Sequence, residues 1–213
     1  MKRLIIFDLD GTLWDSSEQV AASWNIALAE ETGREWHMTA ADIAQNMGLT
    51  MDQIADNLFP EYEAEERYAL ARRCEVFENE YISIHGARLY NGVRETLERL
   101  HGSGALMAVV SNCQKDYVKA FLDSMKMHEL FIDYEEWGRS GLLKADNISL
   151  VMRRNDIDAA VYVGDIQADA DASARAGIPC IWASYGFGHI DEPAAVLDSF
   201  DRLPALLTEL GFM

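Results

Sequence analysis

Short, continuous runs of apolar residues recur along the chain, and longer segments with a helical spacing of apolar positions lie beside them. Runs of this length and composition are typical of strands buried on both faces of a parallel sheet. The strands predicted in this way cover residues 4–7, 105–111, 159–165 and 178–183. The neighbouring helical patterns cover residues 93–101, 115–125, 147–155 and 168–177. Such an alternation predicts an α/β fold with a doubly wound parallel sheet and right-handed crossovers.

A helical region interrupts this alternation after the first predicted strand. The spacing of Val20, Trp24 and Leu28 predicts a helix that Gly33 would end. Further helical patterns follow without a strand between them, at roughly residues 40–46, 51–58 and 63–80. We therefore predict two domains, which are an α/β core of residues 1–15 and 87–213 and an inserted helical-bundle cap domain of residues 16–86.

Composition narrows the class of protein and of partner. The 213 residues are 49% hydrophobic and 25% charged, as is typical of a soluble globular protein. An excess of 36 acidic over 18 basic residues gives a net charge of -18, which argues against non-specific binding to nucleic acid or to anionic membranes. Three widely spaced cysteines, no long apolar run and a strand close to the N-terminus favour a cytoplasmic protein without a membrane span or signal peptide.

Polar residues that could take part in catalysis or binding lie at the ends of the predicted strands. They are Asp8 and Asp10 after the first strand, Ser111 and Asn112 after the second, and Asp165 and Asp169 after the third. Turn formation or helix capping would explain each of them singly. In open α/β sheets, however, ligands bind at the carboxyl ends of the strands. Asp8 and Asp10 would lie on the same side of the chain, and a divalent cation is the usual compensation for such a pair of carboxylates.

Four segments of the chain resemble, in order and approximate spacing, the four motifs of the haloacid dehalogenase superfamily. They are DLDGT, VVSN, Lys144 and GDIQAD. The segments LYNGVRETLERL and DADASARAGIP are similar to the phosphoglycolate-phosphatase-like branch, which also carries a helical cap after the first motif. Ala145 and Asn91 stand where that branch commonly has proline, and both changes concern loop stiffness more than chemistry. The resemblance covers nearly the whole chain and implies a Rossmann-like core.

The resemblance implies a Mg²⁺-dependent phosphatase with Asp8, Asp10 and Lys144 as catalytic residues. Asp8 would attack phosphorus to form an aspartyl phosphate, and Asp10 would protonate the leaving oxygen and later activate water. Lys144 would hold the phosphoryl group and keep Asp8 ionised. Asp8, the backbone carbonyl of Asp10 and Asp165 would bind the metal, with Asp169 supporting it through water or hydrogen bonds.

Further residues would bind the phosphate group or the rest of the substrate. The hydroxyl groups of Ser111 and Thr12, the backbone amide of Asn112 near a helix N-terminus, and Lys144 would hold the phosphate. With Mg²⁺ they would create a local positive site on an acidic protein. In the cap, residues 48–50 resemble a specificity loop, and the nearby polar candidates are Arg34, Gln45 and Asn46. The tryptophans at positions 14, 24 and 36 are expected to pack rather than to bind a ligand.

The expected function is the hydrolysis of small soluble phosphate monoesters, such as phosphoglycolate, sugar phosphates or mononucleotides. The expected enzyme is a monomer or weak homodimer that binds neither nucleic acid nor membrane. A sugar phosphomutase of the β-phosphoglucomutase type remains an alternative, because cap groups that exclude water are not visible in the sequence. A non-catalytic metabolite-binding module is less favoured, because the nucleophile, the acid/base and the metal carboxylates are all present. Dehalogenation is disfavoured because it has no use for a metal site.

Overall fold

A central six-stranded parallel sheet organises the computed structural model, which describes residues 1–213. The strands, in spatial order, are β5 (Asp133–Glu136), β4 (Leu106–Ser111), β1 (Arg3–Phe7), β6 (Ala159–Gly164), β7 (Cys180–Ala183) and β8 (Ala195–Leu197). All neighbouring pairs are parallel. The predicted doubly wound parallel sheet is thereby confirmed. Because β1 lies between β4 and β6, the carboxyl ends of three neighbouring strands carry Ser111, Asp8 and Asp165, with Ser111 as the last residue of β4 and the two aspartates directly after β1 and β6.

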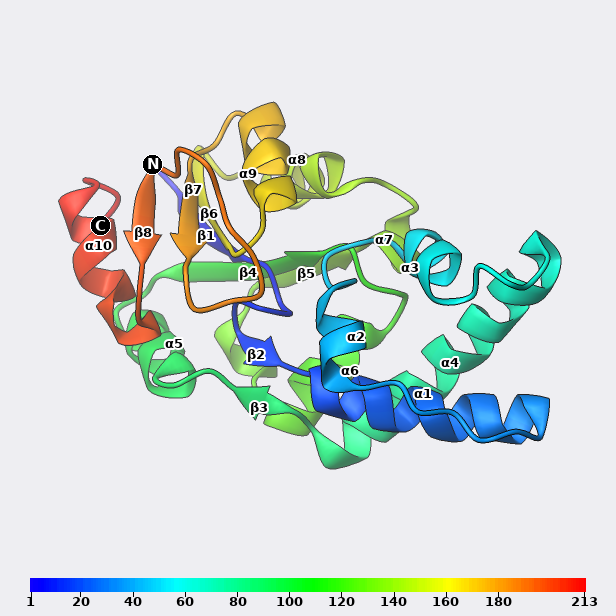
Figure 1. The fold of residues 1–213 in the computed structure, drawn as a ribbon. Coiled ribbons are helices and arrows are strands. Elements are labelled where there is room, and N and C mark those ends of the chain that lie inside the picture. Colours follow the sequence, from blue (N-terminus) through cyan, green and yellow to red (C-terminus); the bar gives the residue numbers. More distant parts are fainter.

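Helices cover both faces of this sheet (Figure 1). One face carries α8 (Lys144–Arg154) and α9 (Gln167–Ala176), and the other carries α5 (Val93–Gly102), α6 (Tyr117–Met125) and α10 (Leu203–Glu209). Alternation along β1 explains the two layers, because Leu4 and Ile6 pack with the first group of helices and Ile5 and Phe7 with the second. By the same alternation the next residue, Asp8, faces α8.

Four helices between Asp15 and Arg88 in the sequence gather beside one end of the sheet, and they are coloured blue to green in Figure 1. They are α1 (Ser17–Thr32), α2 (Ala40–Ala44), α3 (Met51–Leu58) and α4 (Ala64–His85). The chain passes from the sheet to these helices and back through a two-stranded antiparallel ribbon of β2 (Trp14–Asp15) and β3 (Arg88–Leu89). Arg88 Nη2 donates to Asp15 Oδ2 at 2.7 Å, and this contact links the segment that leaves the sheet to the segment that returns to it.

Local sequence explains most of the element ends. Gly33 and Gly177 follow α1 and α9 in left-handed conformations, with φ of +69° and +76°, as expected of helix-ending glycines. Three helices differ clearly from the prediction. Helix α4 continues to His85 rather than ending near residue 80, α6 begins at Tyr117 rather than at residue 115, and α8 begins at Lys144 rather than at residue 147.

Several short elements were not predicted from the sequence. They are β2, β3, β5, β8, α7 (Trp137–Ser140), α10 and the 3₁₀ turns His128–Leu130 and Phe200–Arg202. Strand β5 has the sequence DYEE and therefore lacks the apolar run that marks a buried strand. None of the helices is both long enough and apolar enough to cross a membrane.

Candidate active site

Asp8, Lys144 and Asp169 form a buried ion cluster at the carboxyl end of the sheet. Lys144, the first residue of α8, places its Nζ 2.9 Å from Asp8 Oδ1 and 2.6 Å from Asp169 Oδ1. All three side chains are almost completely buried. Sequence analysis predicted that these residues meet, and the structure brings them together.

Burial and charge act in opposite directions on the cluster. Burial raises the pKa of Asp8 to about 7, although Lys144 opposes this rise. Burial alone would lower the pKa of Lys144, but the carboxylates of Asp169 and Asp8 raise it above its usual range. Lys144 therefore remains a cation at neutral pH, and its charge favours the ionised form of Asp8.

Asp165 completes a group of three carboxylates that could hold a cation. Oxygen atoms of Asp8, Asp165 and Asp169 lie within 4.8 Å of one another. Burial, followed by repulsion from Asp169 and Asp8, raises the pKa of Asp165 well above its usual range. Lys144 offsets only one of the three negative charges. The remaining charge and the hard oxygen donors fit a divalent ion such as Mg²⁺.

Backbone and hydroxyl groups fix the carboxylates of this group. Asp169 Oδ2 accepts the N–H groups of Asp165 at 3.0 Å and Ile166 at 3.2 Å. Since its other oxygen pairs with Lys144, both oxygens of Asp169 are engaged. Asp165 accepts the N–H of Phe187 at 2.8 Å and faces the Thr12 hydroxyl at 3.5 Å.

Gly11 is required by this close packing, because a Cβ at its position would lie 2.1 Å from Asp165 Oδ2. Its φ of +84° also belongs to the left-handed region that favours glycine.

The carboxyl group of Asp10 points into a different hydrogen-bond network. Asp10 Oδ1 accepts Trp14 Nε1 at 2.8 Å, Ser16 Oγ at 2.5 Å and the Tyr117 hydroxyl at 3.0 Å. Burial raises the pKa of Asp10 to about 6, and these three donors limit the rise. Trp14 also packs edge-on against Tyr117 and Phe121, so the expected packing role is confirmed and a donor role is added to it.

Sequence analysis missed these three donors. Trp14 and Ser16 lie outside the motif, and Tyr117 comes from a helix whose sequence gives no sign of pointing at Asp10. The proximity of Trp14 to the first motif was the only available signal.

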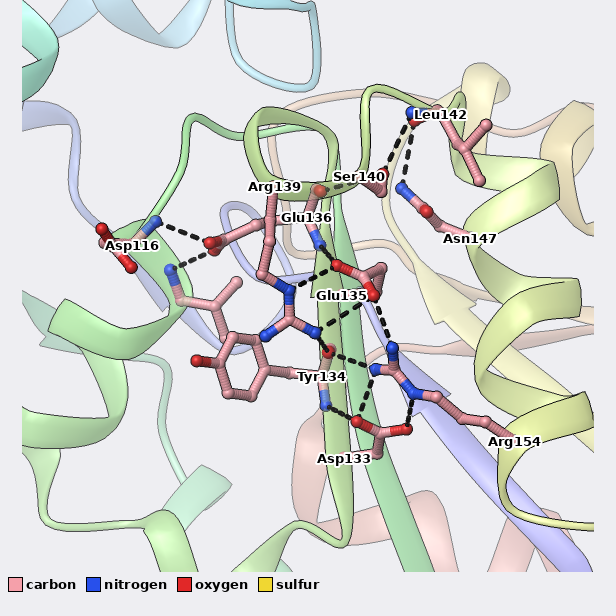
Figure 2. Close-up of polar contacts among 11 residues, drawn as sticks. Asp116, Asp133, Tyr134, Glu135, Glu136, Arg139, Ser140, Leu142, Asn147 and Arg154 are labelled. Atoms are coloured by element: carbon pink, nitrogen blue, oxygen red, sulfur yellow. Dashed lines mark hydrogen bonds and ion pairs between the residues drawn. The ribbon is translucent and has the colours of Figure 1, made fainter.

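A carboxylate on β5 positions Tyr117. Both oxygens of the buried Glu136 accept backbone N–H groups at the start of α6, from Asp116 at 2.6 Å and from Val118 at 3.0 Å (Figure 2). Asp116 has an unusual φ of +70° for a residue other than glycine. Glu136 therefore holds the turn from which Tyr117 reaches Asp10.

A neighbouring network of ion pairs, drawn in Figure 2, holds α8 against β5. Arg154 of α8 bridges Asp133 and Glu135 on β5, with its Nη1 2.6 Å from Glu135 Oε2. Arg139 Nε donates to the other oxygen of Glu135 at 2.8 Å. These ion pairs neutralise the acidic strand and fasten α8 to it, which fixes the helix whose first residue is Lys144.

Ser111 is the last residue of β4 and Asn112 follows it, and Ser111 is buried. Asn112 Nδ2 donates to the Gly48 carbonyl at 3.1 Å, so it links the sheet edge to the segment between α2 and α3. Since α6 begins only at Tyr117, Asn112 lies in the preceding loop rather than in the first turn of the helix. The phosphate-binding role of Ser111, Asn112 and Thr12 stays a prediction.

A pocket lies between this edge of the sheet and helices α1–α4. Asp8, Asp10 and Ser111 line it from the sheet side. Of the predicted specificity residues, Asn46, Gly48 and Leu49 line the pocket, whereas Gln45 and Arg34 do not. Arg34 instead contacts Tyr62 and Glu61 at the surface. The lining residues contributed by the helices include Val20, Trp24, Ile43, Met51, Ile54 and Glu78.

Comparison with known proteins gives matches over most of the chain. The model of a family described as haloacid dehalogenase-like hydrolase matches residues 5–183. A phosphoglycolate phosphatase from Pseudomonas syringae pv. tomato is 32% identical over 225 residues, covering 95% of this chain and 79% of that protein. A phosphoglycolate phosphatase from Pseudomonas fluorescens is 33% identical with the same coverage.

Solved structures share the fold. A predicted phosphoglycolate phosphatase from Haemophilus somnus superposes with a TM-score of 0.83 at 24% identity, covering 96% of this chain and 97% of that chain. CbbY from Rhodobacter sphaeroides, in complex with phosphate, superposes with a TM-score of 0.77 at 20% identity, covering 95% and 96%. At these identities the likeness concerns the arrangement of sheet and helices.

Proposed function

Because the chain belongs to the haloacid dehalogenase-like hydrolases, we propose that it uses Mg²⁺ to hydrolyse small phosphate monoesters through a phosphoryl group carried on Asp8. It is a phosphoric monoester hydrolase, as the names of its curated relatives state of those proteins. The observation that carries the proposal is the buried cluster in which Lys144 pairs with Asp8 beside the carboxylates of Asp165 and Asp169.

Mg²⁺ would be held by Asp8, Asp165 and the backbone carbonyl of Asp10. Asp169 would orient the group, because its two oxygens already bind Lys144 and the backbone of Asp165. When bound, the ion would offset negative charge on the carboxylates and on the phosphate.

Asp8 would act as the nucleophile. One of its carboxylate oxygens bonds to phosphorus, the bond from phosphorus to the ester oxygen breaks, and Asp10 donates a proton to the departing alkoxide. Lys144 Nζ lies 2.9 Å from Asp8 Oδ1, so it would favour the ionised form of Asp8 and would bind the phosphoryl group carried there.

Asp10 would then act as the base. It removes a proton from a water molecule that attacks phosphorus, and the bond between phosphorus and Asp8 breaks, which frees inorganic phosphate and regenerates both carboxyl groups. Burial raises the pKa of Asp10 to about 6, so it can both give and take a proton near neutral pH. Its three hydrogen-bond donors orient it for both steps.

Helices α1–α4 would act as a lid over the reacting groups. The hydrogen bond from Asn112 to Gly48 and the pocket shared by both parts support this role. Closure would exclude bulk water and restrict substrates to small molecules. The net charge of -18 would add repulsion of long polyanions. The names of the relatives make 2-phosphoglycolate one candidate substrate, beside sugar phosphates and mononucleotides.

Release of inorganic phosphate from a panel of phosphorylated metabolites tests the proposal. Phosphate should appear with Mg²⁺, stop with excess chelator and return when Mg²⁺ is restored. The Asp8→Asn variant should release none above background. Full activity in excess chelator would overturn the metal requirement, and quantitative formation of sugar phosphate isomers without phosphate release would identify a phosphomutase instead.

A further inference from the structure

The pocket beside Asp8 carries carboxyl groups but no basic side chain. Asp8 and Asp10 line it at the sheet, and Glu78 of α4 lines it from the helices. No lysine, arginine or histidine is among its lining residues. Beyond the phosphate position, a substrate would therefore meet apolar walls and acidic groups, with no counter-charge for a second anion.

Three arginines of this region, Arg34, Arg67 and Arg73, pair with carboxylates that do not line the pocket. Arg67 Nη1 lies 2.9 Å from Asp56 Oδ1, and Arg73 Nη2 lies 3.1 Å from Glu30 Oε2. Arg34 likewise contacts surface partners rather than the pocket. Lys144 is the nearest cation of the site, and both its carboxylate partners belong to the reaction centre.

Glu78 is held rigidly in the pocket wall. Trp24 Nε1 donates to its Oε2, and Gln114 Nε2 donates to its Oε1 at 2.9 Å. The indole of Trp24 is itself stacked on Phe59, with ring centroids 6.1 Å apart. Glu78 is 4% exposed, so its carboxyl group is shielded from bulk solvent.

We propose that this pocket, if the proposed phosphatase function holds, favours phosphate monoesters whose leaving alcohol carries a hydroxyl group over those whose leaving alcohol carries a carboxylate, with Glu78 as the specificity-determining residue. A hydroxyl group can donate to a free lone pair of the Glu78 carboxyl group while its carbon skeleton lies against the apolar side chains of the helices.

A substrate carboxylate lacks such a partner. Burial of a carboxylate without a cation is strongly unfavourable, and proximity to an ionised Glu78 adds repulsion. When Glu78 is protonated, it offers one hydrogen bond and still no opposite charge. In both states the pocket favours the uncharged leaving group.

Three esters of nearly equal size test the selection. They are 2-hydroxyethyl phosphate, 2-phosphoglycolate and phosphoethanolamine, which end in a hydroxyl group, a carboxylate and an ammonium group. At pH 8.5 with Mg²⁺, kcat/KM should be roughly tenfold or more higher for 2-hydroxyethyl phosphate than for 2-phosphoglycolate, as expected when one polar group in a pocket is mismatched. Use of 2-phosphoglycolate equal to or better than that of the hydroxyl ester would overturn the proposal, and so would a lower kcat/KM for phosphoethanolamine than for 2-phosphoglycolate.

Variants test whether Glu78 causes the difference in kcat/KM between the esters. Glu78→Gln should reduce the preference for the hydroxyl ester at least threefold, and Gln114→Lys, which brings a cation to the same wall, should reduce it further. Glu80→Gln is the matched control, because Glu80 is exposed on the same helix, and it should leave the ratio unchanged. An unchanged ratio in folded Glu78→Gln protein would overturn the assignment.

Binding measurements test the substrate preference of the pocket independently of turnover. Calorimetric titration of Asp8→Asn protein with the same esters should show the same order of affinity, and the reverse order would overturn the selection. Failure of the wild-type enzyme to release phosphate from any ester would instead overturn the proposed function, while the order of affinity would still decide the pocket's preference.

Discussion

Replacement of Glu78 by glutamine should remove a pH dependence of stability that the wild-type protein carries. Burial raises the pKa of Glu78 from 4.5 to about 8, against the hydrogen bonds from Trp24 and Gln114 and with added repulsion from Asp10 and Glu75. The folded protein therefore holds this proton more tightly than the unfolded chain. The stabilisation by neutral Glu78 is complete below pH 4.5 and is lost as the pH rises through about 8.

The magnitude follows from the change in pKa. At about 1.4 kcal/mol for each pKa unit, the loss amounts to roughly 4 kcal/mol between pH 4.5 and pH 9. Glutamine keeps a neutral group of the same shape at this position. Its amide can donate to Gln114, after the Gln114 amide turns over, and its carbonyl can accept from Trp24.

Denaturant unfolding of the wild type and Glu78→Gln at pH 5, 7 and 9 measures the effect. All samples should contain chelator, so that metal binding does not contribute. Because the other buried carboxyl groups are common to both proteins, they cancel in the difference between the two free energies of unfolding. This difference should shift in favour of the variant by several kcal/mol between pH 5 and pH 9, whereas Glu80→Gln should follow the wild type. A difference that stays constant over this range would refute the reasoning.

The remaining predictions concern the reaction centre and its supports. Asp8→Asn should fold, as judged by circular dichroism, and lose phosphate release by several orders of magnitude, and near-normal turnover would exclude Asp8 as nucleophile. Asp165→Ala should abolish activity or raise the Mg²⁺ concentration needed for half-maximal rate, which a Mg²⁺ titration would reveal. Tyr117→Phe removes the hydroxyl group that donates to Asp10, so kcat should fall about tenfold with little change in KM, and an unchanged kcat would contradict this role. Glu136→Gln loses a charge-assisted hydrogen bond to the start of α6, worth about 1.5–3 kcal/mol, and thermal unfolding should show a Tm lower by roughly 3–12 °C.

The sequence was informative wherever one short segment carries both the element and its chemistry. The apolar run before Asp8 and the apolar run before Asp165 predict two buried strands. Parallel pairing of these strands brings their carboxyl ends together. Lys144 was recognised as one of the four motifs, but the periodicity predicted its helix only from residue 147, whereas α8 begins at Lys144 itself.

Contacts between segments that are far apart in the sequence could not be predicted from local patterns. Strand β5 is acidic, and it is stable only because Arg139 and Arg154 come from elements that follow it. Tyr117 and Asp10 are far apart in the chain, and no periodicity indicates that the phenol of one reaches the carboxyl group of the other. The position of Glu78 was equally hidden, because a glutamate on a charged helix is ordinarily solvated.

The ribbon of β2 and β3 shortens the length of chain that must be closed into a loop when β1 pairs with β4. These strands pair from Leu4 with Leu106 onward, although the intervening chain includes all of α1–α4. Once the ribbon has joined Asp15 to Arg88, that excursion is closed, and the loop that remains between the strands is roughly fourfold shorter. Since closure entropy grows with the logarithm of loop length, the shortening lowers the free energy of bringing β1 to β4 by about 1 kcal/mol. The insertion can thus be long without a proportional entropic cost to the pairing of β1 with β4, because the ribbon leaves only a short connection between these strands.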